Sequence, residues 1–309
     1  MLAIFLKTLP FFAVIGLGFA AGRLRFFSDE ATAYLTKFVF YFALSAMLFG
    51  FAANLDLSGV FSWGFVWAYF LATLLVWMVV AGVAIARGIP LQEAVFEAHT
   101  GVIGNVGFLG IPMLALLLGP KAVGPVLLVL AVDLVVFSSV LTILISGLRE
   151  GRMSVAMVRI VAIGLLKNPM IGSVVLGMAW GATGWALPVP VNEFMTMLGA
   201  AATPCALFAI GASLASRRAE RVEVAVWLSF AKLVLHPAAV AVAALVVFDV
   251  ETYAAGVMIA AAALPVAGNV FILAQHYGVA PQRVSASILI STAVSVLTVT
   301  AVIALVEGL

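Results

Sequence analysis

Charged residues are scarce in this chain of 309 residues: Asp, Glu, Lys and Arg together make up 9% of it. Soluble domains carry about 25% charged residues. Hydrophobic residues make up 65% and the mean hydropathy is +1.27, which is typical of helical membrane proteins with many spans. The polar stretches are too short for a soluble catalytic domain, and a net charge of +2 is too small to indicate a nucleic-acid partner. We therefore expect one integral domain embedded in a lipid bilayer.

Cysteine and ligand-binding motifs are equally scarce. The single cysteine, Cys205, excludes an internal disulfide. No metal-ligand spacing, nucleotide-binding loop or Ser-His-Asp arrangement occurs, so the sequence predicts neither a metal site nor a cofactor. Residues 1–22 lack the basic start of a signal peptide, and Lys7 lies inside the apolar stretch. We interpret this segment as a retained first helix.

Long apolar stretches fill the rest of the chain. Each has about 20 residues or more, enough to cross a hydrocarbon core of about 30 Å. The hydropathy pattern predicts ten spans, near residues 3–22, 31–53, 60–86, 94–118, 122–147, 157–181, 190–215, 222–247, 253–275 and 284–306. Of these, only the fourth and the ninth are expected to be interrupted.

Arginine indicates the orientation of these spans. All ten arginines fall on one side, in alternate connections, whereas the other side has only Lys7 and Lys121. Basic residues stay in the cytoplasm. The sequence therefore predicts that both termini are extracytoplasmic and that residues 148–157 form a short cytoplasmic loop. If the source is bacterial, the protein belongs in the inner membrane.

The two halves of the chain resemble each other. Residues 10–22 (PFFAVIGLGFAAG) match residues 169–181 (PMIGSVVLGMAWG), GNV occurs at 104–106 and 268–270, and SVLT occurs at 139–142 and 295–298. The matches follow the same order in both halves, which predicts five-helix repeats over residues 1–148 and 149–309. Because five is an odd number, the second repeat enters the membrane from the opposite side. The predicted fold is all-α, with ten transmembrane helices in two inverted repeats.

Residues that weaken a helix lie in the middle of the fourth span. Gly104 and Asn105 occur there, and Pro112 frees the carbonyl of Phe108 because proline has no N–H. No water is available at this depth to satisfy such a group. A broken helix at a binding site is therefore predicted.

The ninth span repeats this pattern. Pro265 is expected to free the carbonyl of Ala261, and Gly268 and Asn269 follow. Freed carbonyls coordinate cations, whereas the N-termini of half-helices attract anions. We predict that both interruptions form one substrate site, although kinked helices with closely packed glycines would show the same pattern. The predicted substrate-binding residues are Gly104, Asn105, Pro112, Pro265, Gly268 and Asn269.

Asp133 lies in the middle of the fifth span, in the stretch VLAVDLVVF. A carboxylate at this depth costs about 2.5–3.5 kcal/mol on insertion scales, so it needs a cavity or a partner. One interpretation is a group that couples transport to H⁺ or Na⁺. The other is a hydrogen-bonded carboxyl that holds two helices together.

Other ionisable residues leave several interpretations open. Lys232 and His236 are four residues apart and share a helix face. Lys232 either neutralises Asp133, attracts an anion or extends to the membrane interface. Glu97 belongs either to a proton path, together with His99, or to the cytoplasmic boundary of the fourth span.

The sequence resembles a bacterial member of the auxin efflux carrier family over essentially its whole length. The resemblance rests on the ten-span layout and on GNVGFLGIP at 104–112, TPCALFAIGASL at 203–214 and LPVAGNVFILAQHYG at 264–278. It implies an inverted-repeat fold like that of bile-acid and sodium–proton transporters. Spans four and nine would cross at the substrate, and spans one, two, six and seven would form a scaffold, often a dimer.

The same resemblance implies organic anions as substrates: auxin in plants, and malate, malonate or similar carboxylates in bacteria. It implies that Asn105 contacts the substrate and that Asn269 is its partner at the crossing. Asp133 replaces an uncharged polar residue of plant members, which leaves room for ion coupling. The long cytoplasmic loop of many plant members is missing, so control by loop phosphorylation is not implied.

The sequence therefore predicts a secondary transporter of small carboxylates that works by alternating access. A sodium/bile-acid-type symporter of similar fold is the nearest alternative. An intramembrane enzyme normally needs paired catalytic groups, and Asp133 has no evident carboxylate partner at equal depth. A receptor or channel is disfavoured by the paired broken helices.

Overall fold

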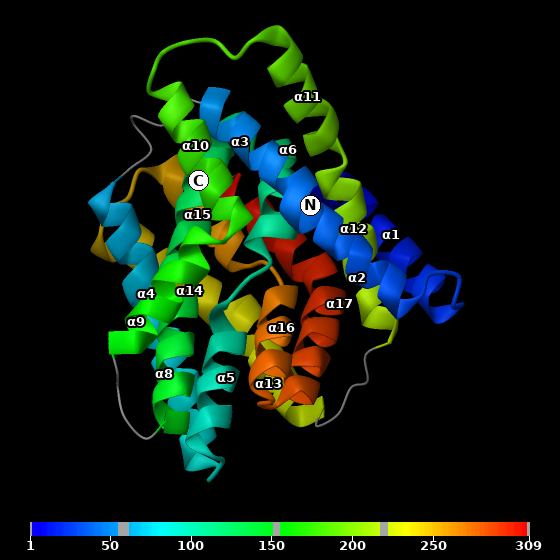
Figure 1. Cartoon of the computed structure of the whole chain (residues 1–309). Helices are drawn as coiled ribbons and strands as arrows, with labels where there is room; N and C mark the ends of the chain where they lie inside the picture. Colours follow the sequence, from blue (N-terminus) through cyan, green and yellow to red (C-terminus); the bar gives the residue numbers. More distant parts are fainter. Residues whose placement is uncertain (1, 55–61, 151–154, 217–221, 308–309) are drawn as a thin grey trace.

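The computed structural model describes residues 2–54, 62–150, 155–216 and 222–307. Their structure is helical, and no strand occurs in these ranges beyond one isolated bridge (Figure 1). The first half contains helices α1 Leu2–Arg23, α2 Asp29–Phe38, α3 Leu44–Asn54, α4 Trp63–Ala86, α5 Leu91–Val102, α6 Ile111–Leu117, α7 Val123–Ala131 and α8 Ser138–Glu150. The second half contains α9 Val155–Leu166, α10 Pro169–Gly181, α11 Val189–Ala200, α12 Ala202–Ala215, α13 Val222–Phe230, α14 His236–Val242, α15 Thr252–Ala262, α16 Gly268–Tyr277 and α17 Pro281–Val306.

Short irregular turns join several of these helices into longer rods. They are the π-helical turns η1 Val39–Ala43, η2 Val106–Gly110, η4 Val132–Phe137, η5 Ala231–Leu235 and η6 Ala243–Val247, and the 3₁₀ turn η3 Pro120–Ala122. In the described part of the chain, seven helical rods are long and apolar enough to cross a membrane. They are Ile4–Arg23, Asp29–Asn54, Trp63–Ala86, Pro120–Arg149, Val189–Ala215, Val222–Val247 and Pro281–Val306. Each coincides with one predicted span.

The three remaining predicted spans consist of shorter helices. Two of them are the spans expected to be broken. The third, over 157–181, was predicted without an interruption, and in this respect the prediction is wrong, because α9 ends at Leu166 and α10 begins at Pro169. Asn168 caps α10 by accepting a hydrogen bond from the N–H of Met170 at 3.0 Å. Proline fits the first position of a helix, where its missing N–H is not needed, so the Asn-Pro pair starts a new helix.

The most extensive helix contacts join the two halves of the chain. α1 packs along α12, and α3 packs along α10. At the first contact the backbones touch, because a Cβ added at Gly211 would lie 1.9 Å from the carbonyl oxygen of Ile15. A Cβ at Gly18 would lie 2.1 Å from the carbonyl oxygen of Phe208. Small residues permit this close packing inside membranes.

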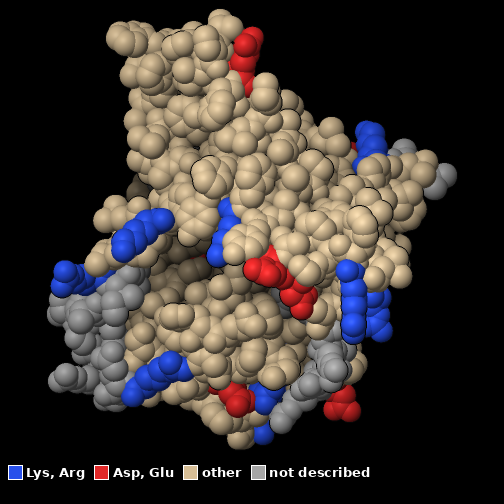
Figure 2. Space-filling view, turned by 45° about the vertical axis from the view of Figure 1, so that its right-hand side comes forward, with Lys and Arg blue, Asp and Glu red and all other residues tan. Residues whose placement is uncertain are grey.

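A second group of helices surrounds the interrupted segments. α5, α13, α16 and α17 lie side by side in the lower part of Figure 1, and α4 packs against α5 and α14. The buried charged residues Glu97 and Arg283 lie in α5 and α17 of this group, and the buried residues Asp133 and Lys232 lie in the turns η4 and η5. The outer surface is different: charged side chains are sparse in Figure 2, and large apolar side chains such as Leu176 are exposed. An apolar exterior with ionisable groups inside is the distribution expected of a polytopic membrane protein.

Candidate functional site

The two interrupted helices meet at their breaks. Residues 103–105 separate α5 from η2, and residues 263–267 separate α15 from α16. Gly104 and Val266 form an antiparallel bridge. The N–H of Asn105 donates to the carbonyl oxygen of Pro265 at 2.8 Å, and the N–H of Ala267 donates to the carbonyl oxygen of Ile103 at 3.1 Å. Each break thus satisfies backbone groups of the other where water is not available. We call this pairing the crossing.

Helix ends of both polarities converge at the crossing. α5 and α15 end there, and α16 and the rod formed by η2 and α6 begin there. Helix N-termini carry partial positive charge and C-termini partial negative charge. The crossing therefore offers N–H groups to an anion and carbonyl groups to a cation.

The structure places five of the six predicted substrate-binding residues at or next to the crossing. Gly104, Asn105 and Pro265 lie in the paired segments, and Gly268 and Asn269 open α16. The side-chain oxygen of Asn269 is buried and has no hydrogen-bond partner among the described residues. The sixth residue, Pro112, lies at the start of α6, outside the pairing.

The carbonyl that the ninth span makes available is not the predicted one. Pro265 was expected to free the carbonyl of Ala261, but this oxygen accepts from the N–H of Leu264 at 3.3 Å. A tighter last turn of this kind is common at helix C-termini. The oxygen of Ala262 instead accepts from the side-chain amine of Lys232. Val266, which would bond to Ala262 in a continuous helix, donates to the hydroxyl of Ser291 at 3.1 Å.

Lys232 reaches the crossing from η5 and is completely buried, with 0% of its surface exposed. The interpretation that Lys232 extends to the membrane interface is therefore wrong. Its Nζ lies 3.2 Å from the position of a Cβ added at Gly104. The lysine thus passes beside the backbone of the other break, and Gly104 leaves the space for it. Lys232 contacts both halves of the crossing.

A hydrogen-bonded chain extends from Lys232 to α4. The Nζ of Lys232 lies 3.1 Å from Nδ1 of His236, and Nε2 of His236 lies 2.9 Å from the hydroxyl of Thr73. An ammonium only donates, so Nδ1 accepts and Nε2 carries the hydrogen that is donated to Thr73. The predicted shared face of Lys232 and His236 is therefore confirmed.

Asp133 lies beside this chain and is 2% exposed. Its Oδ1 accepts a hydrogen bond from the hydroxyl of Tyr69 at 2.8 Å, whereas its buried Oδ2 has no partner in the described part of the chain. Asp133 and Lys232 are close enough to attract each other electrostatically. Tyr69 and Thr73, four residues apart in α4, were not identified from the sequence. Their only signal there is the spacing of two polar groups within an apolar span.

Two of the buried charged residues occur in π-helical turns. Asp133 lies in η4 and Lys232 in η5. Such turns insert an extra residue into a helix, weaken its regular hydrogen bonding and occur often at functional sites. Their position at the two charged residues supports a functional assignment for this part of the core.

A second group of charged residues surrounds α5, away from the crossing. Glu93 and Glu97 lie in this helix, and their arginine partners come from the end of α4 and from α17. The carboxylate of Glu97 is buried and pairs with Arg87, and it also accepts from Arg283 at 2.9 Å. Arg283 also pairs with Glu93 at 2.7 Å. The Glu97 carboxylate thus pairs with two guanidinium groups from different helices, an arrangement that favours a structural role over a proton path.

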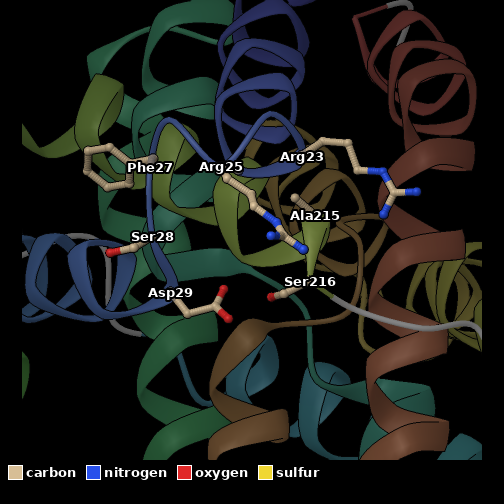
Figure 3. Close-up of a pocket in the computed structure, with 8 residues that line it drawn as sticks. Arg23, Arg25, Phe27, Ser28, Asp29, Ala215 and Ser216 are labelled. Atoms are coloured by element: carbon tan, nitrogen blue, oxygen red, sulfur yellow. The ribbon is translucent and has the colours of Figure 1, made fainter.

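One pocket of about 410 Å³ lies away from the crossing, where α1 and α12 end. It is lined by Gly22, Arg23, Arg25, Phe27, Ser28, Asp29, Ala215 and Ser216. Figure 3 shows the side chains of Arg25, Asp29 and Ser216 directed into the same space. It includes none of the predicted site residues, so it is separate from the candidate site.

Interrupted helices that meet around buried charged and amide groups are typical of membrane transporters. The sequence model of a family described as membrane transport protein matches residues 3–303 of this chain. A protein of Rhizobium meliloti (strain 1021), named "Putative malonate transporter", is 31% identical over 306 residues, which cover 97% of this chain and 95% of the relative. The chain belongs to this family, that of the auxin efflux carriers, and is a membrane transporter rather than an enzyme.

Proposed function

We propose that the protein is a secondary transporter of small carboxylates and that a dicarboxylate such as malonate binds at the crossing. The observation that carries this proposal is the pairing of residues 103–105 with residues 263–267, next to buried polar groups. The name of the Rhizobium relative supports the choice of malonate. Uptake of radiolabelled malonate into proteoliposomes tests the proposal, with protein-free liposomes as the control. Uptake no greater than in the control, for malonate and for malate, would contradict it.

We further propose the inverted repeat, with five helices in residues 1–148 and five in residues 149–309. Two packing contacts support it. α1, in the first span, packs on α12 in the seventh, and α10, in the sixth span, packs on α3 in the second. Exchanging the two repeats converts one contact into the other, as a repeat requires. The repeat would supply the two equivalent arrangements that alternating access needs. We also propose that the scaffold formed by α1, α3, α10 and α12 is the surface through which a homodimer forms.

The two asparagines are proposed to bind the substrate directly. A buried polar contact is worth about 1–3 kcal/mol when its partner is left unsatisfied. Asn105→Ala or Asn269→Ala should therefore weaken malonate binding by about tenfold or more while the protein stays folded. Isothermal titration calorimetry on purified protein measures this effect. Asn192→Ala, an exposed change in α11, is the matched control, and unchanged affinity in both site variants would refute their role.

The orientation follows from the arginines and is tested by labelling. Ala182 is exposed in the connection that precedes the predicted seventh span, and Ser216 is exposed directly after that span. On a Cys205→Ala background, Ala182→Cys should react with a membrane-impermeant maleimide in intact cells. Ser216→Cys should react only after the membrane is opened. The reverse pattern would place both termini in the cytoplasm.

A further inference from the structure

A dicarboxylate in the core of the protein needs positive charge next to it. Hydrogen bonds from amides are weaker than those from a charged donor. A charged ligand in a medium of low polarity is stable only when it is paired. At the crossing, the N-terminus of α16 contributes partial positive charge, and Lys232 brings the amine of a basic side chain.

The charge of Lys232 is directed to neutral partners. Its Nζ bonds to the carbonyl oxygen of Ala262 and to Nδ1 of His236. Among the described residues, the ion pairs within 4 Å are those of Glu93 and Glu97 with arginines, away from this lysine. Asp133 attracts Lys232 without such a direct pair. The ammonium therefore retains capacity for an anionic partner.

A cation bound to the carbonyl at the end of α15 would compete with Lys232 for that oxygen. The break leaves the buried carbonyl oxygen of Ala262, at the end of α15, without a partner in the helix, and such an oxygen can be a ligand for Na⁺. The lysine already donates to that carbonyl. Gly104 leaves space for the side chain, because an added Cβ would lie 3.1 Å from its Cε. The chain thus supplies its own cation at the crossing.

We propose that Lys232 is the specificity-determining residue for the carboxylate: its ammonium binds the anion at the crossing and replaces a metal cation there, so that substrate binding needs no Na⁺. This inference rests on the proposed function, because it names the group that recognises the proposed substrate. It also predicts the class of ligand. A carboxylate binds, whereas its neutral amide does not.

Calorimetry on the purified full-length protein tests the inference, with malonate and the uncharged analogue malonamide as probes. The parent protein should bind malonate equally well in sodium chloride and in N-methyl-D-glucamine chloride. Lys232→Met keeps the length of the side chain and removes its charge, and it should weaken malonate binding by about tenfold or more. Lys121→Met, an exposed lysine, is the matched control and should bind as the parent does.

Each result decides between the inference and the proposed function. Unchanged affinity in a folded Lys232→Met protein, or malonate binding that requires Na⁺, overturns the inference and leaves the proposed function intact. Absence of carboxylate binding and transport by the parent protein refutes both. If Lys232→Met does not fold, Lys232→Arg and the sodium comparison decide: arginine retains the charge, so malonate should still bind in sodium-free buffer and malonamide should not. Loss of this preference would overturn the inference.

Discussion

Replacing Asp133 by asparagine is expected to abolish gradient-driven accumulation of malonate while leaving exchange of malonate across the membrane intact. Asparagine has nearly the same shape as a protonated aspartate but cannot release or take up a proton. Asp133 is buried, and its Oδ2 has no partner in the described part of the chain, and on this ground we propose that it loads and unloads a coupling ion. If Lys232 supplies the cation for substrate binding, the coupled ion is a proton. Accumulation should then follow an imposed pH gradient and not an imposed sodium gradient.

Proteoliposomes make the comparison direct. Counterflow measures exchange without a gradient, and uptake after an acid jump outside the vesicles measures accumulation. Tyr69→Phe is the matched control, because it removes the hydrogen bond at 2.8 Å but keeps the carboxylate. It should therefore still accumulate malonate. Accumulation by Asp133→Asn equal to that of the parent would show that Asp133 is structural. Loss of all expression would favour a carboxyl that holds η4 against α4.

The interruptions could be predicted from the sequence because their cause is local. Gly104 and Pro265 weaken a helix wherever they occur inside an apolar span, and the breaks lie at residues 103–105 and 263–267. Asp133 was identified for a similar reason, because a carboxylate in the middle of an apolar span stands out in the local sequence alone. The break at Asn168 and Pro169 was missed because apolar residues continue on both sides of it and the hydropathy pattern shows one stretch.

The partners of the buried charges could not be predicted in this way. Tyr69 is 64 residues from Asp133, and Lys232 is 30 residues from the Ala262 carbonyl that it contacts. Such contacts depend on which helical rods pack against each other, and the periodicity of a single helix does not reveal this. The sequence therefore left three interpretations of Lys232 open. Its burial excluded the interface, its attraction to Asp133 supports the first interpretation, and its hydrogen bonds to neutral partners leave the second open.

Glu97→Gln is expected to cause a large loss of stability. The Glu97 carboxylate is buried between Arg87 of the α4 end and Arg283 of α17, so its removal leaves the largely buried guanidinium of Arg283 with one carboxylate instead of two. Breaking a buried ion pair on one side costs about 3–5 kcal/mol in the free energy of unfolding. Thermal unfolding of the purified protein should show a clearly lower midpoint. Glu93→Gln is the comparison variant: the Glu93 side chain is 30% exposed and, among the described residues, pairs with Arg283 alone, so this change should lower the midpoint less than Glu97→Gln does.

The Glu97 result also separates two roles for this cluster. A structural role predicts that Glu97→Gln protein, assayed below its lowered melting point, still exchanges malonate and still accumulates it in a pH gradient. A proton path predicts the opposite, an unchanged melting point with accumulation lost. The first outcome would mean that the cluster fixes α5 against α4 and α17. Because residues 103–105 directly follow α5, the cluster would then hold the first break in the register that lets it pair with the second.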